Sequence, residues 1–185
     1  MKISFSPGVL LLFPVLLLKG GMLFPAALLA AALHESGHLL MGRWLGIRFS
    51  RMEFDLLGAR LYPTRLPSYR EEFFLVIAGP LFSLLPLLFA PVLLGSAFLK
   101  YFFYSSLSFA LFNLLPFRGS DGGRALCAAL SFFFPPAAVD RISAGTTYLT
   151  LLFLFSLSGC MLLRYGQNFL LCLFSAWLFA RFFFN

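Results

Sequence analysis

Residues 22–41 read MLFPAALLAAALHESGHLLM, an apolar run that contains a single polar cluster. The run is long enough to cross the hydrocarbon core of a bilayer as a helix, which takes about 20 residues. Its cluster holds both histidines of the chain, His34 and His38, and Glu35 directly follows the first. An ionisable residue in such a segment costs about 2.5–3.5 kcal/mol on insertion scales. We therefore expect these side chains to face a polar interior, a partner or a metal.

The composition of the whole chain is typical of a membrane protein. Of its 185 residues, 61% are hydrophobic and 11% are charged, whereas a soluble domain is about half apolar and about a quarter charged. This excludes a soluble globular enzyme, and the high hydrophobicity excludes a disordered chain. The net charge of +7 includes no basic cluster interleaved with aromatic residues, so we expect no nucleic-acid partner. The three cysteines have no metal-binding spacing.

Apolar runs separated by glycine, proline and charge predict about six transmembrane helices. The expected spans are residues 3–18, 22–41, 73–94, 97–116, 138–163 and 169–184. The first span is short, and a signal peptide is its alternative interpretation, although no small-x-small cleavage site follows it. Whether it crosses the membrane completely is left open. An apolar piece that ends at residues 135–136 is too short to cross and is expected at the membrane interface.

Residues 43–72 form a charged segment between the second and third spans. They carry 10 of the 21 charged residues of the chain, so this segment lies outside the hydrocarbon. Apolar residues alternate roughly from Ile47 to Leu56, and Gly58 is available for a turn. This pattern predicts a small β-hairpin within residues 47–61.

The distribution of lysine and arginine predicts the orientation of the chain. If the amino terminus is cytoplasmic, six crossings place eleven of the fourteen basic residues inside and three outside. The positive-inside rule favours this arrangement. We therefore expect both termini, and the charged segment 43–72, on the cytoplasmic side of the membrane.

The spacing of the two histidines indicates a metal site. Four residues on an α-helix correspond to about 400°, so the imidazoles of His34 and His38 lie on one face, separated by about 6 Å of rise. Glu35, about 100° around the helix, can reach a water on the metal without being a ligand. This is the HExxH arrangement, in which two histidines hold Zn²⁺ and the glutamate is a general base.

A catalytic zinc site needs a third protein ligand, and few acids are available. Asp121 stands apart from the other acids and is followed by Gly122-Gly123. It lies just after the inner end of span 97–116, and His38 lies near the inner end of span 22–41. The predicted topology therefore brings them to the same depth of the membrane. A turn residue is the alternative interpretation of Asp121.

Four short motifs together resemble a known family. Residues 34–38 (HESGH), 78–80 (AGP), 113–116 (NLLP) and 121–124 (DGGR) are similar to motifs of the site-2 protease family of intramembrane zinc metalloproteases. The resemblance is greatest to the compact bacterial branch of the stage IV sporulation protein FB type. Prolines and a leucine are common in the family where this chain has Arg118, Gly119 and Ser120.

The resemblance implies a role for each residue that matches a motif. It implies that His34, His38 and Asp121 bind one Zn²⁺ per chain and that Glu35 activates water. It also suggests that Asn113, a polar amide within an apolar span, holds the substrate or stabilises the oxyanion.

The expected fold class is an all-α polytopic membrane protein, with about six transmembrane helices around a three-helix catalytic core and a β-hairpin in the 43–72 segment. We expect a single transmembrane metalloprotease domain over residues 1–185, with its core at about 22–134. Neither a PDZ nor a CBS domain is expected.

The expected function is that of a zinc metalloendopeptidase in the bacterial cytoplasmic membrane, with its active site towards the cytoplasm. It would cleave a membrane-associated protein in or near a transmembrane segment. A pro-sigma factor is one candidate substrate, and a membrane protein is a candidate regulator. The alternatives are a catalytically silent scaffold or chaperone and, third, a metal transporter. The cleavage position and the oligomeric state are not predicted.

Overall fold

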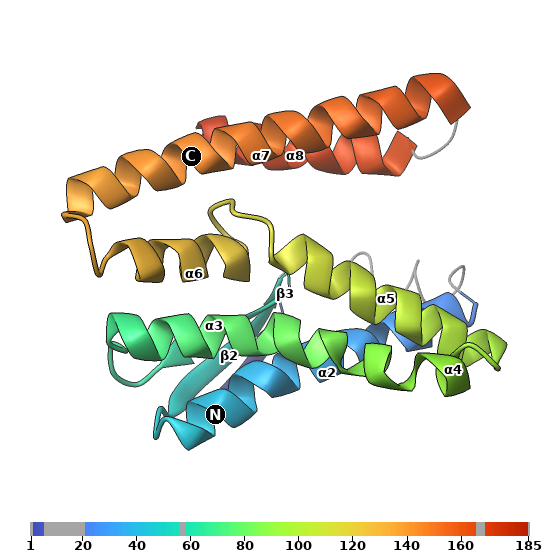
Figure 1. Cartoon of the computed structure of the whole chain (residues 1–185), viewed down its shortest axis with the longest axis horizontal. Coiled ribbons are helices and arrows are strands. Elements are labelled where there is room, and N and C mark those ends of the chain that lie inside the picture. Colours follow the sequence, from blue (N-terminus) through green and yellow to red (C-terminus); the bar gives the residue numbers. More distant parts are fainter. Residues whose placement is uncertain (1, 6–20, 56–57, 166–168, 185) are drawn as a thin grey trace.

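The structure is a computed structural model that describes residues 2–5, 21–55, 58–165 and 169–184 (Figure 1). The helices are α2 (Leu23–Trp44), α3 (Tyr69–Leu84), α4 (Ala90–Leu93), α5 (Ala97–Asn113), α6 (Asp121–Leu130), α7 (Pro136–Tyr165) and α8 (Phe169–Phe184), and a 3₁₀ helix, η1, covers Leu85–Phe89. The strands are β1 (Lys2–Phe5), β2 (Phe49–Asp55) and β3 (Gly58–Pro63).

Helices α2, α3 and α5 pack on one another and form the core, and α6 packs on α3. Small residues let α2 approach its neighbours, since Ala26 and Ala30 are completely buried. At Gly37 the approach is closer still, because a Cβ there would lie 2.5 Å from the carbonyl oxygen of Ala78 in α3. Such contacts between small residues are typical of helix packing in membranes. The predicted three-helix core is confirmed.

Among the described residues, three helical segments are long and apolar enough to cross a membrane. They are Leu23–Trp44, Tyr69–Val92 and Pro136–Arg164. Helices α5 and α8, with 17 and 16 residues, coincide with two further predicted spans but are shorter than the three segments above. The number and apolarity of these helices make the chain a membrane protein of mostly helical structure, as predicted.

The third predicted span is not one continuous α-helix. Helix α3 ends at Leu84, and the chain continues as the 3₁₀ helix η1 and the short helix α4. Pro86 and Pro91 lie at the starts of these two elements. Proline has no backbone N–H and clashes with the preceding turn, so it disfavours the interior of an α-helix, although α3 accommodates Pro80, and it is tolerated at a helix start.

The charged segment forms the predicted hairpin. Strands β2 and β3 are antiparallel, from Phe49 opposite Pro63 to Asp55 opposite Gly58, with an irregularity between Phe49 and Arg51. The strand order of the sheet is β1-β2-β3. Within the described part of the chain, β3 is therefore an edge strand.

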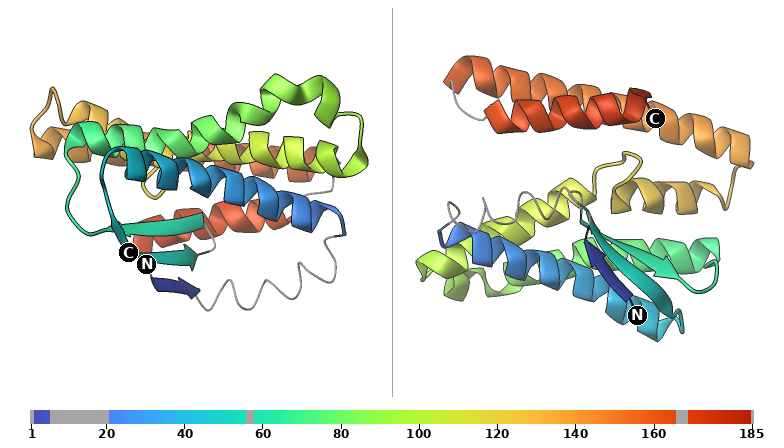
Figure 2. Two further views of the ribbon diagram at one scale, coloured as in Figure 1. Left: turned by 90° about the horizontal axis from the view of Figure 1, so that it is seen from below. Right: turned by 180° about the vertical axis from the view of Figure 1, so that it is seen from behind.

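The amino-terminal strand β1 was not predicted. It pairs with β2 in parallel, with Lys2 opposite Arg51 and Phe5 opposite Phe54. The prediction that a transmembrane helix begins at residue 3 is therefore wrong, and residues 6–20 of that expected span lie outside the described residues. The sheet, which includes β1, and the carboxyl end of α8 lie at the same end of the molecule (Figure 2).

Helices α7 and α8 form an antiparallel pair that contacts the rest of the protein mainly through α6 (Figures 1 and 2). Their own contact includes a hydrogen bond of 2.8 Å between the buried hydroxyls of Ser158 and Ser175. Polar side chains commonly join helices in this way within a bilayer.

Candidate metal centre

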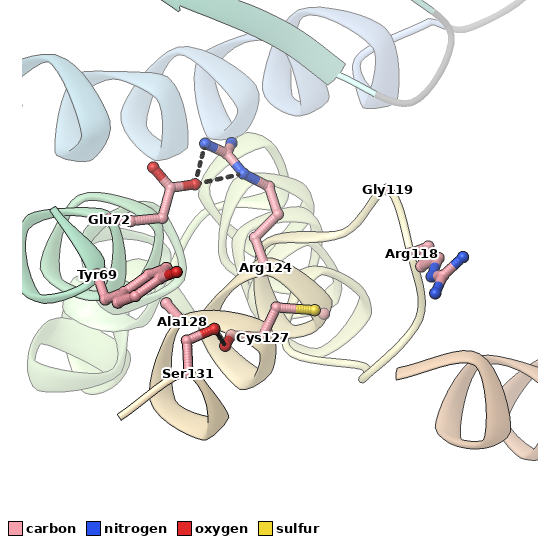
Figure 3. A pocket seen from close by; sticks show the side chains of 9 residues that line it. Tyr69, Glu72, Arg118, Gly119, Arg124, Cys127, Ala128 and Ser131 are labelled. Atoms are coloured by element: carbon pink, nitrogen blue, oxygen red, sulfur yellow. Dashed lines mark hydrogen bonds and ion pairs between the residues drawn. The ribbon is translucent and has the colours of Figure 1, made fainter. Parts of the chain in front are cut away.

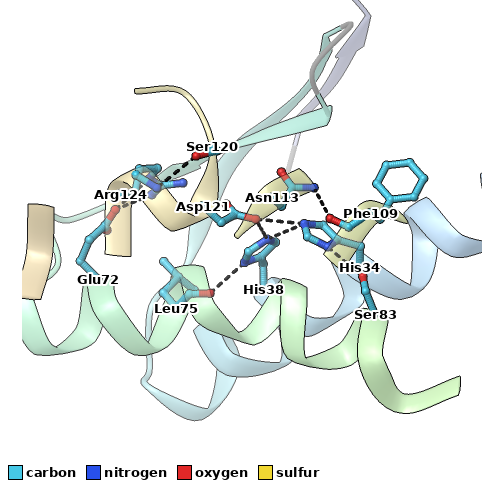
Figure 4. A network of polar contacts seen from close by, with 11 residues as sticks. His34, His38, Glu72, Leu75, Ser83, Phe109, Asn113, Ser120, Asp121 and Arg124 are labelled. Atoms are coloured by element: carbon cyan, nitrogen blue, oxygen red, sulfur yellow. Dashed lines mark hydrogen bonds and ion pairs between the residues drawn. The ribbon is translucent and has the colours of Figure 1, made fainter. Parts of the chain in front are cut away.

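Three side chains from two helices converge in the interior (Figure 4). Nε2 of His34 and Nε2 of His38, both on α2, lie 3.0 and 3.1 Å from Oδ2 of Asp121 at the start of α6. The two Nε2 atoms are 3.3 Å apart. Both imidazoles are buried. The structure thus brings together the three residues that sequence reasoning selected as metal ligands.

The opposite nitrogen of each imidazole is also held. Nδ1 of His38 donates to the carbonyl oxygen of Leu75 at 2.8 Å, and Nδ1 of His34 lies 2.9 Å from the hydroxyl of Ser83. Both partners belong to α3. Histidines that bind metals usually have such a partner on the second ring nitrogen, because it fixes the orientation of the ring. Helix α3 therefore directs both Nε2 atoms towards Asp121.

The donor set fits a divalent cation. Because Nδ1 of His38 carries a proton, a neutral ring has a lone pair at Nε2, facing the carboxylate of Asp121. Such electron pairs repel at 3.1 Å unless a proton or a cation lies between them. Ligand atoms about 2.0–2.1 Å from a tetrahedral Zn²⁺ lie about 3.3–3.4 Å from one another, close to the separations here. Two imidazoles and a carboxylate are ligands that zinc prefers.

Glu35 and Asn113 lie beside this cluster. Glu35 follows His34 in the sequence, its side chain is half-buried, and its Oε2 atom is buried. Asn113 is the last residue of α5, is 9% exposed, and donates from Nδ2 to the carbonyl oxygen of Phe109 at 3.1 Å. The ring of Phe109 packs against His34 with 6.1 Å between centroids. The catalytic and substrate-binding roles of Glu35 and Asn113 stay predictions.

No protein-family model matches this sequence, and no curated protein matches it. Among solved structures, the chain is similar to the site-2 protease from Methanocaldococcus jannaschii. The two share 23% sequence identity and a TM-score of 0.62 over 92% of this chain and 82% of that chain. This protein has the site-2 protease fold.

Within this site-2 protease fold, the Ala78-Gly79-Pro80 motif of α3 packs directly against the histidine motif. The carbonyl of Ala78 faces Gly37, and Gly79 lies under the ring of His38. A Cβ at Gly79 would lie 2.5 Å from Cε1 of that ring, closer than carbon atoms can approach. The motif is thus a surface of backbone and glycine on which the ligand-bearing helix rests.

The positions that depart from the family pattern have clear structural roles in this version of the site-2 protease fold. Ser120 caps α6 by accepting from the backbone N–H of Gly123 at 3.0 Å. Gly119 has a φ of 103°, which favours glycine. Arg118 reaches α7, where it donates to the hydroxyl of Ser143 and the carbonyl of Asp140. These contacts hold the loop that begins α6, so Asp121 is still presented to the histidines.

Sequence reasoning missed the residues of α3 and α6 that support the ligands. Ser83 is 1% exposed, and a polar residue within an apolar span was the available signal. Arg124, one turn after Asp121, donates to Oε1 of Glu72 through Nε at 2.9 Å and Nη2 at 2.6 Å (Figure 3). This ion pair joins α6 to α3 next to the candidate metal ligands.

Replacing Ser83 by alanine is expected to weaken zinc binding by about 10- to 100-fold. The substitution removes the partner of His34 Nδ1, so the ring can rotate away from Asp121. Competition with a chelator of known affinity measures the change. Ser106→Ala in α5 is the matched control, because this serine is equally buried and its hydroxyl bonds none of the described residues. Equal zinc affinities in the two variants would contradict the role given to Ser83.

Proposed function

We propose that this protein is an intramembrane zinc metalloprotease that cleaves membrane-associated proteins in or near a transmembrane segment. The observation that carries the proposal is the convergence of His34, His38 and Asp121 on one point, with the far nitrogen of each imidazole held by α3. The similarity to a site-2 protease of known structure supports it.

Each residue of this site would have a separate role in hydrolysis. His34, His38 and Asp121 would hold one Zn²⁺, which supplies a Lewis acid that polarises a carbonyl and makes water more acidic. Glu35 takes the proton of the attacking water and returns it to the leaving amine, as a general base and then a general acid. Asn113 holds the substrate at the end of α5. The burial of the site limits access to other nucleophiles.

The substrate segment must be extended before it is cleaved, since a helix keeps its peptide bonds inside its own hydrogen-bonded backbone. Leu61 and Pro63 of β3 line a small crevice together with His38 and Asp121. An edge strand beside the metal ligands supports strand addition, in which an extended peptide pairs with β3. The hairpin would then align the scissile bond with the metal centre.

Proline substitutions test this use of β3. Neighbouring residues of an antiparallel strand direct their N–H groups to opposite sides, so either Leu61→Pro or Tyr62→Pro removes an N–H that faces away from β2. Whichever of the two variants removes this outward N–H is expected to keep zinc and to cleave about 10-fold or more slowly, because a backbone hydrogen bond to the substrate is lost. Ser4→Pro on the opposite edge is the control. Cleavage that is unchanged in both β3 variants would dismiss strand addition.

Metal removal and reconstitution test the function itself. Purified protein in proteoliposomes is expected to contain one zinc per chain, to cleave a transmembrane peptide, to stop when zinc is chelated, and to resume when zinc is restored. A transporter would instead carry zinc across the vesicle membrane. A scaffold would bind the peptide and leave it intact with or without zinc. Either result would contradict the proposed protease function.

We further propose that the protein lies in a bacterial cytoplasmic membrane, with both termini and the metal centre towards the cytoplasm. The pairing of β1 with β2 supports a shared side for the amino terminus and the charged segment 43–72, because the two strands belong to one sheet. A pro-sigma factor or another membrane-associated protein would be the substrate, under the control of a membrane partner. Accessibility of cysteines introduced near either terminus to a membrane-impermeant reagent tests the orientation.

A further inference from the structure

Arg124 lies between two cavities beside the metal centre. One is the small crevice, of about 20 Å³, that it lines with His38, Asp121 and β3. The other, of about 420 Å³, lies between α3, α6 and the loop that precedes α6, and there the guanidinium sits at the edge away from Cys127 and Ser131 (Figure 3). Arg124 is thus the charged side chain that borders both the metal ligands and the edge strand.

The ion pair with Glu72 uses only part of the guanidinium. Nε and Nη2 both donate to the same oxygen of Glu72. Within the part of the chain that the structure describes, Nη1 makes no hydrogen bond. The side chain of Arg124 is 46% exposed and that of Glu72 is 23% exposed. The ion pair therefore fixes the position of a guanidinium whose Nη1 atom still has two N–H groups to offer.

We infer that Arg124 binds the substrate, by donating from Nη1 to a backbone carbonyl oxygen of the extended segment that lies between β3 and the metal ligands. This inference rests on the proposed function. A neutral acceptor suits the site because Glu72 already balances the charge of Arg124, so a substrate carboxylate would leave an uncompensated negative charge. The ion pair with Glu72 acts as a brace that holds the guanidinium in place, and Nη1 makes the contact with the substrate.

Two substitutions that break the same ion pair separate binding from bracing. Arg124→Gln removes both the brace and the contact, whereas Glu72→Gln removes the brace and leaves the guanidinium. The probe is a dye-labelled transmembrane peptide that the wild-type protein cleaves, and its Kd is measured in a Glu35→Gln background, where turnover is expected to be about 10²- to 10⁴-fold slower. We expect Arg124→Gln to raise Kd by about 10-fold or more, the loss expected for a hydrogen bond to a charged donor.

In the same assay Glu72→Gln is expected to change Kd by less than about 3-fold, and Arg124→Lys to restore part of the affinity. In the active protein, Arg124→Gln should raise KM more than it lowers kcat, with zinc content unchanged.

Equal effects of Arg124→Gln and Glu72→Gln would mean that the pair only braces α6 against α3, and would overturn the inference. Tighter binding of peptides with added carboxylates would overturn the choice of a neutral acceptor. Failure of the wild-type protein to cleave any transmembrane peptide would refute the proposed function instead.

Discussion

Glu35→Gln is expected to retain zinc and to cleave substrate about 10²- to 10⁴-fold more slowly than the wild-type protein, the range that general acid–base catalysis contributes. The substitution preserves the size and the polarity of the side chain but removes its ability to accept a proton at neutral pH. His34, His38 and Asp121 keep their contacts, because the residues that hold them belong to α3 and α6. Metal binding and turnover should therefore separate in this variant.

Zinc content by atomic emission and cleavage of a labelled transmembrane peptide measure the two properties. Glu53→Gln is the matched control, since Glu53 lies in β2, where it pairs with Arg51 and Tyr62 away from the metal ligands. It should cleave at close to the wild-type rate. If Glu35→Gln supported the biological role of the protein without any loss, the scaffold alternative would be favoured over the protease.

The convergence of His34, His38 and Asp121 was predictable because each residue is distinguished by a separate feature of the sequence. The spacing of His34 and His38 depends only on the helical period, and the apolar run around them makes a helix the expected structure. Asp121 was selected by its depth, which follows from counting spans, and the structure places its Oδ2 atom about 3 Å from both imidazoles. The hairpin was predictable for a similar reason, since alternation over residues 47–56 is a local pattern.

The features that were not predicted depend on distant parts of the chain. Strand β1 has only four residues, at the start of an apolar run, and it is stabilised by β2 about 50 positions later. Four residues are too few to show a strand period. The support of His34 by Ser83 is equally non-local, because 49 residues separate them. A single sequence shows that Ser83 is polar but does not show which neighbour it meets.

Gly79→Ala is expected to weaken zinc binding by more than about 100-fold, beyond the usual effect of losing a supporting contact. In most helices this substitution is favourable, because alanine has the higher helix propensity by about 1 kcal/mol. Here the added methyl group would occupy the place of the His38 ring, with 2.5 Å to Cε1 and 2.8 Å to Cδ2. Since the ring is also held by the carbonyl of Leu75, it can move only by breaking that bond and turning Nε2 away from Asp121.

Gly145→Ala is the matched control for this prediction. Gly145 also lies within a helix, α7, but a Cβ there would meet no atom within 4 Å. This variant should bind zinc and cleave peptide as the wild-type protein does, and its thermal stability should be equal or slightly higher. Chelator competition on both variants distinguishes a specific clash from a general effect of removing a glycine. Zinc affinity in Gly79→Ala equal to that of Gly145→Ala would mean that the His38 ring does not need the space above α3, and that its observed position is not the one that binds metal.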